Sequence, residues 1–493
     1  MKTHPDWTQP FNARLVLKGY KQIPGIDFGE TFAPVARLVS FQLLVALTIL
    51  NHWEIYHIDV SMAFLNPPVD GDIYMQLPEG VDWLEPSKLT SKTVCKLNKA
   101  LYGLKQALRL WYDHFNKFLQ TIELYRSPNN CNLYIANDRK LLLLLYIEDI
   151  LIISKYKDQI QEMKFKLHAQ YEMKDLGLAR RFLAIELDYF ENCLQLHQSS
   201  FIQTILLQFK MNECNGVFTP FETGQRLLAA TEQDELIDPS KYQSLIGSLM
   251  YLVAGTRPDI AFPIATLRKL NPRPTNQHFL AAKRVLRYLQ QTFNWGLVYQ
   301  KSQQQQEIES YADSDFAGDF GDRKSTSGYI FSLAGAAISW KAKKHSLVSL
   351  SSTEAEHIGY SEAAREAIWL RRLYHEITTT ELQLQLIKCD NQEAIGLREN
   401  PKFHEHTKHI DIKYHFIWDC FDKELITLRY VPTTLMVADI MTKALPRDTH
   451  HRHVWNMGVR TLYFMLLLYY KLFLFCSYFL LHVRDTLFPP TYL

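Results

Sequence analysis

The sequence predicts an α/β (α+β) protein with more than one domain, and three observations carry that prediction. The chain has 493 residues, which is too long for a single hydrophobic core, so about two to four domains are expected. Helix-period segments alternate with short apolar, strand-like runs along most of its length. A polar, glutamine-rich stretch at 301–310 separates two such regions and is the clearest linker.

The first region has a regular order of elements. Residues 41–50 predict a helix and residues 54–65 predict a strand. A long amphipathic helix follows a short turn within 95–122, and an apolar hairpin at 141–153 leads to another helix at 157–171. Strand, helix, hairpin and helix in this order are typical of an α/β arrangement with side chains presented at the strand tips.

Acidic residues interrupt the apolar strands of this region. Asp59 ends a predicted strand, and Glu148 with Asp149 occupies the turn of the apolar hairpin. A charge between apolar runs is costly unless it is paired or coordinates a metal. Two divalent ions that bridge a phosphate require about three carboxylates from different strands. One such acid alone is more often solvated, whereas three with apolar flanks favour a metal site.

A helical region at 240–293 follows. Its last helix has an apolar stripe and, on the other side, a basic cluster of Lys283, Arg284 and Arg287. This cluster fits either a solvated face or a phosphate-contacting face, and the sequence leaves both open. The formal net charge of +2 gives no general reason to expect a nucleic-acid partner, so a basic binding surface would have to be local.

The region after the linker starts a second α/β pattern with its own acids. Asp313, Glu356, Asp390 and Asp439 each fall at a predicted element boundary. The histidine runs at 404–415 and 450–453 have no cysteine partners at zinc-site spacing, so we expect a polar, phosphate-facing surface there and no zinc. The seven cysteines are scattered and never spaced as CxxC, which argues against a disulfide framework and for a reducing compartment.

Long motifs in this chain resemble a known family. The segments "ARLVLKGYKQIPGIDFGETFAPVARL" (13–38), "HIDVSMAFLN" (57–66), "LYGLKQALRLWY" (101–112) and "YIEDI" (146–150) resemble the reverse transcriptase of copia-type LTR retrotransposons. "YADSDFAGDFGDRKSTSGYIF", "SSTEAE", "KCDNQEAI" and "ADIMTKALP" resemble the ribonuclease H domain appended to it. The resemblance runs from about Ala13 to Pro446, with the motifs in the family's order.

The resemblance implies a right-hand polymerase of fingers, palm and thumb, followed by a ribonuclease H-like mixed-sheet domain. The implied parts are listed by residue number: 1–222 reverse transcriptase fingers and palm, 223–300 helical thumb or connection, 301–310 linker, 311–447 ribonuclease H-like domain and 448–493 an apolar tail outside the family pattern. The chain is expected to start inside the fingers, without the upstream strands of the family.

By the same resemblance, the palm acids Asp59, Glu148 and Asp149 bind metal and catalyse RNA-directed DNA synthesis. Four further residues are expected to bind substrate: Phe64 excludes the 2′-hydroxyl of the incoming sugar, Gln106 lies near the templating pair, and Phe182 and Ala184 belong to a strand at 182–187 that grips the primer terminus. The implied partners are an RNA template, a DNA primer and deoxynucleoside triphosphates.

The ribonuclease H part would cleave the RNA strand of an RNA–DNA hybrid. Its metal-binding and catalytic acids are expected to be Asp313, Glu356, Asp390 and Asp439, with Glu356 preferred over Glu354 because "EHIG" fits the family pattern. Two Mg²⁺ ions are implied in each active site, with Mn²⁺ as an alternative. Recognition of the hybrid would depend on the 2′-hydroxyl and duplex shape and not on base sequence.

Departures from the family pattern concern the polymerase part, Glu148 and Ala184 among them. Glu148 stands where the pattern has aspartate, and its additional methylene moves the carboxylate by about an ångström, an error that can cost on the order of a hundredfold in rate. Ala184 stands where the pattern has glycine. All four ribonuclease H acids are kept. The sequence therefore predicts impaired polymerase activity beside nuclease activity, and a non-catalytic nucleic-acid-binding relic is the alternative.

The C-terminal stretch 461–481 is apolar over about a bilayer's width, apart from Lys471. It fits either a transmembrane anchor or a translated run-on beyond the last folded domain, and we expect the run-on. The N-terminus has no apolar core of signal-peptide length. A cytoplasmic location is expected, with a virus-like particle or the nucleus as alternatives and no stable membrane partner. The oligomeric state stays open.

Overall fold

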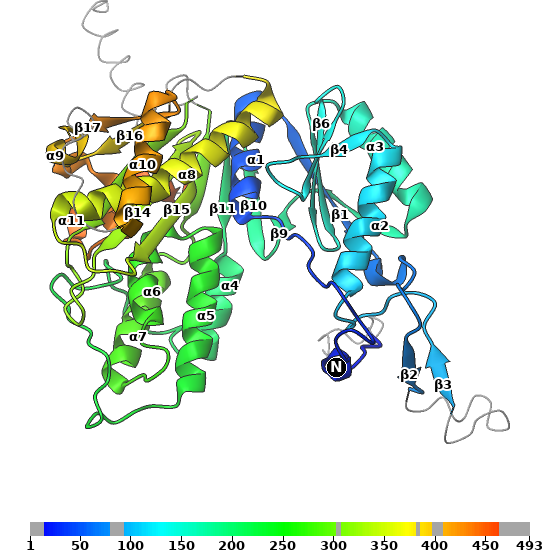
Figure 1. Cartoon of the computed structure of the whole chain (residues 1–493), viewed down its shortest axis with the longest axis horizontal. Coiled ribbons are helices and arrows are strands. Elements are labelled where there is room, and N and C mark those ends of the chain that lie inside the picture. Colours follow the sequence, from blue (N-terminus) through cyan, green and yellow to red (C-terminus); the bar gives the residue numbers. More distant parts are fainter. Residues whose placement is uncertain (1–13, 79–92, 302–306, 381–384, 397–407, 463–493) are drawn as a thin grey trace, which may run out of the picture. The chain divides into compact units, whose positions relative to one another are not determined.

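The computed structural model describes residues 14–78, 93–301, 307–380, 385–396 and 408–462 (Figure 1). The chain divides into two compact units. Unit 1 is drawn from Met1–Arg37 and Trp53–Ala179, and unit 2 from Leu38–His52 and Arg180–Leu493. This division differs from the predicted break at residue 222, because the strands and the helix of 181–208 belong to a sheet and a core of unit 2. Each unit is described by itself below.

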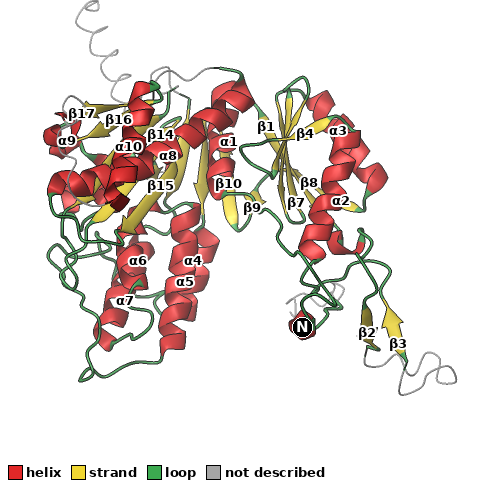
Figure 2. Cartoon of the chain, in the orientation of Figure 1, coloured by secondary structure: helices red, strands yellow, loops and turns green. Residues whose placement is uncertain are grey.

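Unit 1 is built on a six-stranded antiparallel sheet with the order β4-β5-β6-β7-β1-β8 (Figure 2). Its strands are β1 (Glu54–Val60), β4 (Leu124–Arg126), β5 (Leu133–Ala136), β6 (Leu141–Tyr146), β7 (Asp149–Ser154) and β8 (Met173–Leu178). The central strands β6 and β7 are buried along nearly their whole length, which explains why their sequences are continuous apolar runs.

Two helices cover this sheet, and a small hairpin extends from the unit. The helices are α2 (Ala107–Thr121) and α3 (Lys157–Gln170), and the hairpin pairs β2 (Tyr74–Gln76) with β3 (Val94–Lys96). The buried face of α2 carries Trp111, Phe115 and Leu119 at helical spacing, and these side chains join the core formed with the sheet. The amphipathic pattern therefore predicted this helix correctly, although it begins only after the turn at 103–106.

The predicted strand 54–65 is shorter in the structure. It ends at Val60, Met62 takes a left-handed backbone conformation with φ of 50°, and Ala63–Leu65 forms a turn of 3-10 helix. Apolar residues continue through this segment because Ala63 returns to the core, so the hydrophobic pattern alone could not show where the strand stops.

Unit 2 contains a second sheet that collects strands from distant parts of the chain. Its order is β18-β12-β11-β10-β9, with strands β9 (Arg181–Phe182), β10 (Ile185–Phe190), β11 (Cys193–His197), β12 (Gly296–Gln300) and β18 (Val459–Arg460). Helix α1 (Leu38–Asn51) packs on β12 and on β15 of the sheet described next, which explains why it is apolar on most sides.

The four helices between β11 and β12 form a common apolar core (Figure 1). They are α4 (Ser199–Gln208), α5 (Pro239–Gly255), α6 (Ala261–Arg268) and α7 (Asn276–Gln291). Arg257 and Asp259 are fully buried between them and form a salt bridge of 2.7 Å from Nη2 to Oδ2. Because both partners are present, neither charge is left uncompensated in the core.

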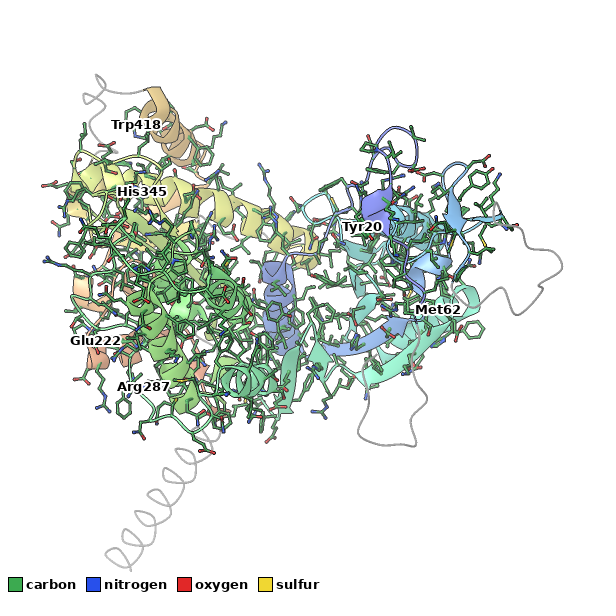
Figure 3. The ribbon with its side chains drawn as sticks, turned by 90° about the horizontal axis from the view of Figure 1, so that it is seen from below. Tyr20, Met62, Glu222, Arg287, His345 and Trp418 are labelled. Atoms are coloured by element: carbon green, nitrogen blue, oxygen red, sulfur yellow. The ribbon has the colours of Figure 1, made fainter. Side chains whose placement is uncertain are left out.

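The basic face of α7 binds protein, not solvent alone. Arg284 Nη1 lies 2.6 Å from Glu222 Oε1, and Arg287 Nε donates to the backbone oxygen of Asn215 at 2.8 Å. Glu222 and Arg287 are both labelled in Figure 3. The sequence left open a solvated face and a phosphate-contacting face. The structure shows a third role for Arg284 and Arg287, since both hold the loop at 212–222.

The last sheet has the mixed order β15-β14-β13-β16-β17. Its strands are β13 (Glu309–Asp315), β14 (Thr326–Leu333), β15 (Ala336–Lys344), β16 (Gln385–Cys389) and β17 (Ile426–Tyr430). Strands β13 to β15 are antiparallel neighbours, whereas β16 runs parallel to β13 and β17 parallel to β16. The accompanying helices are α8 (Ser352–Thr378), α9 (Gln392–Gly396), α10 (Lys408–Asp422) and α11 (Arg447–Asn456). The predicted α/β (α+β) class is confirmed.

Two predicted boundaries in unit 2 need correction. Strand β13 begins at Glu309, inside the stretch assigned to the linker, and Ser310 is buried. Residues 448–462 were assigned to the apolar tail, but α11 and β18 belong to the fold, because β18 pairs with β12. Within the described residues no helix has the length and apolar character needed to cross a bilayer, and 463–481 of the apolar stretch lie outside them.

Candidate functional site

Three of the predicted acids converge in unit 2. Asp313 lies on β13, Glu356 on the first turns of α8, and Asp390 directly after β16. One carboxylate oxygen from each lies within 4.8 Å of the other two. Among the described residues, no other group of three or more acidic, histidine or cysteine side chains lies close enough together to share a metal ion. Parallel pairing of β13 with β16 and packing of α8 on β13 bring the three elements together.

Close approach of α8 to β13 depends on Gly359. A Cβ atom at this position would lie 2.4 Å from Ser314 Oγ and 3.1 Å from Ser327 Oγ, so a larger residue would push the helix away from the sheet. Glu356 is one helical turn before Gly359 on α8, and it therefore lies beside Asp313.

The three acids open into a cavity of about 600 Å³. Its other lining residues come from five segments: Ser314, Asp315, Phe316, Ser352, Asn391, Gln392, Glu393, Tyr430 and Lys443. Phe316 is 42% exposed and Tyr430 is 43% exposed, so two aromatic side chains border the acidic floor and remain accessible to a ligand.

Electrostatics around the acids favour a bound cation. Burial, and then the neighbouring Asp313 and Asp390, raises the pKa of Glu356 well above its ordinary value. Burial likewise raises the pKa of Asp313. Glu356 Oε2 is buried and accepts no hydrogen bond from the described residues. Converging carboxylates with an unsatisfied buried oxygen are the donor set that Mg²⁺ and Mn²⁺ prefer, so these residues fit the implied metal.

Asp439 lies near this triad but outside it. It belongs to the 3-10 turn Val437–Met441, and its Oδ1 lies 2.9 Å from Lys443 Nζ. Burial, followed by Asp313, raises the pKa of Asp439 to about 7. Burial alone would lower the pKa of Lys443, but Asp313 and Asp439 raise it above its ordinary value, so the ammonium stays charged beside the cavity.

Hydroxyl groups fix two of the triad acids. Thr442 Oγ1 donates to Asp313 Oδ2, and Thr433 Oγ1 donates to Asp390 Oδ2 at 2.8 Å. The sequence prediction missed Thr433, Thr442 and Lys443. The last two follow Asp439 within four residues, and that proximity was the signal available in the sequence.

The acids of unit 1 are arranged differently. Asp59 on β1 lies opposite Asp149, the first residue of β7, in the antiparallel register. Glu148 follows Ile147, whose φ of 58° forms the tight β6–β7 turn. Among the described residues these three acids do not converge as Asp313, Glu356 and Asp390 do.

Other side chains hold two of the palm acids. His57 Nε2 lies 2.8 Å from Asp149 Oδ1, and the hydroxyl of Tyr102 donates to Glu148 Oε2 at 3.0 Å. Burial, and then the negative charge of Asp149, raises the pKa of Asp59. Asp59 and Asp149 are therefore close enough for the charge of one to act on the other, while Glu148 is hydrogen-bonded to Tyr102.

Two predicted substrate-binding residues lie in the same unit. Phe64 is partly buried, and its ring packs edge-on against Tyr102 with centroids 4.9 Å apart. Gln106 is only 1% exposed, and its amide donates to the backbone oxygen of Asp27 at 3.0 Å and accepts from Gln22 at 3.1 Å. Gln106 thus stabilises the loop at 22–27, and its amide could contact a template only if these hydrogen bonds broke.

The other two lie in unit 2, and the predicted strand at 182–187 is a turn between two strands. Phe182 ends β9 and is buried against Phe41. Leu183 and Ala184 take φ angles of 49° and 52° and reverse the chain into β10. Positive φ at both central residues is the geometry of a two-residue hairpin turn, which usually contains glycine or asparagine. The apolar sequence carried no such signal.

The histidine runs do not form the expected polar surface where the structure describes them. His450 and His453 on α11 are buried, and burial lowers the pKa of each to about 4. The prediction was wrong for these two because α11 packs into unit 2 through them. His404 and His406 lie outside the described residues.

Comparison with known proteins extends these observations. Residues 2–223 match the family model described as reverse transcriptase (RNA-dependent DNA polymerase). The chain is 37% identical over 448 residues to the retrovirus-related Pol polyprotein from transposon TNT 1-94 of Nicotiana tabacum, covering 89% of this chain and 33% of that protein. It is 36% identical over 452 residues to the Pol polyprotein from transposon RE1 of Arabidopsis thaliana, covering 91% of this chain and 30% of the relative. The chain thus spans about a third of these polyproteins.

A shorter relative is covered almost completely. A protein named for transposon Ty5-1 in Saccharomyces cerevisiae is 32% identical over 312 residues, which are 62% of this chain and 99% of that protein.

Among solved structures, a foamy viral protease–reverse transcriptase in complex with an RNA/DNA hybrid matches 77% of this chain and 44% of its own, at 13% identity and a TM-score of 0.42. These values are too low to support an assignment, which rests on the sequence matches. By those matches, the chain belongs to the family of copia-type LTR retrotransposon Pol polyproteins.

Proposed function

We propose that unit 2 is a ribonuclease H that cleaves the RNA strand of RNA–DNA hybrids. The observation that carries this proposal is the convergence of Asp313, Glu356 and Asp390 at the floor of an open cavity. These carboxylates would hold two Mg²⁺ ions, together with Asp439. When bound, such ions lower the pKa of a water and stabilise the leaving oxygen of a phosphodiester.

The protein's own groups then position the substrate. Lys443 keeps its charge at the cavity wall and would attract a backbone phosphate. Thr442 and Thr433 hold Asp313 and Asp390 in fixed orientations. Phe316 and Tyr430 offer exposed aromatic faces at the rim, where sugars of a duplex would pack.

For unit 1 we propose an RNA-directed DNA polymerase site that uses Asp59, Glu148 and Asp149, with an RNA template, a DNA primer and deoxynucleoside triphosphates as partners. Activity of this site is proposed to be impaired by Glu148. The support is the pairing of Asp59 with Asp149 and the engagement of Glu148 by Tyr102. Phe64 would remain the steric test against a 2′-hydroxyl.

The first experiment is cleavage of a labelled RNA–DNA hybrid by the full chain in Mg²⁺, with single-stranded RNA and RNA duplex as controls. We expect hybrid-specific cleavage that Asp313→Asn abolishes and EDTA stops. Salt-dependent hybrid binding without cleavage would overturn the nuclease proposal and leave a nucleic-acid-binding relic.

A further inference from the structure

Tyr102 contacts both Glu148 and Phe64, the residue expected to exclude a 2′-hydroxyl on the incoming sugar. Its hydroxyl donates to Glu148 Oε2 at 3.0 Å, and its ring packs edge-on against Phe64. The guanidinium carbon of Arg14 lies 4.2 Å from the centroid of the same ring. Tyr102 itself is only 8% exposed. A buried ring held on two sides has little freedom to move its hydroxyl away from Glu148.

The backbone of Glu148 is also fixed. The indole Nε1 of Trp111 donates to the oxygen of Ile147 at 2.7 Å, and the amide of Val60 donates to the oxygen of Glu148 at 2.9 Å. Because the turn cannot shift easily, the direction of the carboxylate depends on the side chain alone. The additional methylene of glutamate, relative to aspartate, is what lets this carboxylate extend to its partner.

The hydrogen bond from Tyr102 occupies a carboxylate oxygen that an ion would need. A tyrosine that keeps its proton beside a carboxylate competes with any cation for the same oxygen, since an oxygen that accepts a hydrogen bond must give it up or share it to coordinate an ion.

The geometry points to Tyr102 as a positioning residue that holds the Glu148 carboxylate in a hydrogen bond, beside Phe64, and so competes with a cation for it. The inference rests on the proposed polymerase site in unit 1. According to this inference, Glu148 impairs the site because Tyr102 holds its carboxylate, and not only because its side chain is longer than that of aspartate. An aspartate at 148 is too short to make the same contact from the same backbone and would be free to turn to the ion.

Binding of Mn²⁺, followed by the electron paramagnetic resonance of the free ion, tests this without relying on activity. The full chain carries Asp313→Asn and Glu356→Gln in all samples, so that the unit 2 triad contributes little to the signal. Tyr102→Phe removes only the hydroxyl and keeps the ring against Phe64 and Arg14. We expect Mn²⁺ to bind about tenfold more tightly to this variant, the effect of releasing one hydrogen bond to a charged acceptor.

Two further variants make the result specific. Tyr56→Phe removes another tyrosine–glutamate hydrogen bond in unit 1, from Tyr56 to Glu54 at 3.2 Å, and should leave Mn²⁺ binding unchanged. In a Glu148→Asp background, Tyr102→Phe should have no effect, because the two changes act on one interaction. Unchanged or weaker Mn²⁺ binding in Tyr102→Phe alone would overturn the inference, as would an equal gain in the aspartate background.

The proposed polymerase function fails separately. If Tyr102→Phe tightens Mn²⁺ binding as expected but no variant extends a primer on an RNA template, the positioning role stands and the polymerase assignment of this copy falls. If primer extension occurs but Tyr102→Phe does not change Mn²⁺ binding, the polymerase assignment stands and the positioning role of Tyr102 falls.

Discussion

Glu354 and Glu356 lie two residues apart on α8, yet their carboxylates serve different neighbours. Glu354 Oε2 accepts a hydrogen bond from the backbone amide of Leu350 at 2.6 Å, and its own amide donates to Ser351 Oγ at 3.1 Å. Glu356 instead joins Asp313 and Asp390. The first glutamate therefore holds the chain at the start of α8, where Ser351 is the N-cap, and the second belongs to the candidate metal centre.

This division of roles predicts opposite effects of two substitutions. Glu356→Gln should reduce hybrid cleavage by more than about a hundredfold, because a metal ligand is lost. In EDTA it should raise the apparent melting temperature, because glutamine avoids the cost of burying an ionisable carboxyl beside Asp313 and Asp390. Glu354→Ala should lower the free energy of unfolding by about 1 kcal/mol, the worth of one hydrogen bond at the start of the helix, and retain cleavage. Loss of cleavage in Glu354→Ala at a temperature where it is folded would contradict this assignment.

Glu148→Asp should restore primer extension on an RNA template. The shorter side chain escapes Tyr102 and places its carboxylate closer to that of Asp149, and a positional error of about an ångström can cost on the order of a hundredfold in rate. Rates of single-nucleotide addition in Mg²⁺ are the measurement, and hybrid cleavage by the same preparation should not change. Equal extension by both proteins would mean that glutamate is tolerated.

Ala184→Gly should stabilise the chain. Ala184 has a φ of 52°, a left-handed conformation that costs an L-residue with a Cβ about 1 kcal/mol more than glycine. We expect the free energy of unfolding, from urea titration, to rise by that amount. The matched control is Ala282→Gly in the buried face of α7, where the same change should cost about 1 kcal/mol or more. A loss of stability at 184 would show that the methyl group packs usefully in the turn.

Acid should destabilise unit 2 through its buried histidines. Burial lowers the pKa of His450 to about 4, whereas an unfolded histidine titrates near 6.5. Between these values the unfolded state binds the additional proton, so the free energy of unfolding falls as the pH drops from about 6.5 to about 4. The loss attributable to His450 is about 3 kcal/mol.

His450→Phe keeps an aromatic ring against Tyr288, whose ring centroid lies 5.5 Å from that of His450. The variant should therefore show a flatter dependence of the melting temperature on pH between about 4 and 6.5. Parallel curves for the variant and the original would show that His450 does not titrate on unfolding.

The sequence predicted the elements and residues that belong to long motifs or regular hydrophobic patterns. It did not predict roles that depend on which side chains meet in the folded chain. Asp313, Glu356 and Asp390 could be found because their motifs are long, and the fold brings them together. The hydrogen bonds of Gln106 could not be predicted, since nothing in "LYGLKQA" shows that its amide is bonded to the backbone at Asp27. His450 looked like a surface residue because polarity usually means exposure, and only the packing of α11 reverses that expectation.

The strand β12 has a consequence for how this chain can be divided. It pairs on one side with β11, which lies before α4 to α7, and on the other with β18, which comes after the mixed sheet β15-β14-β13-β16-β17. Val298 and Gln300 also donate to the backbone oxygens of Gly458 and Ala334. A protease that cut the chain between β12 and β13 would therefore nick it without releasing an independent domain. The two fragments would stay joined by a shared sheet, and damage to either one would destabilise both.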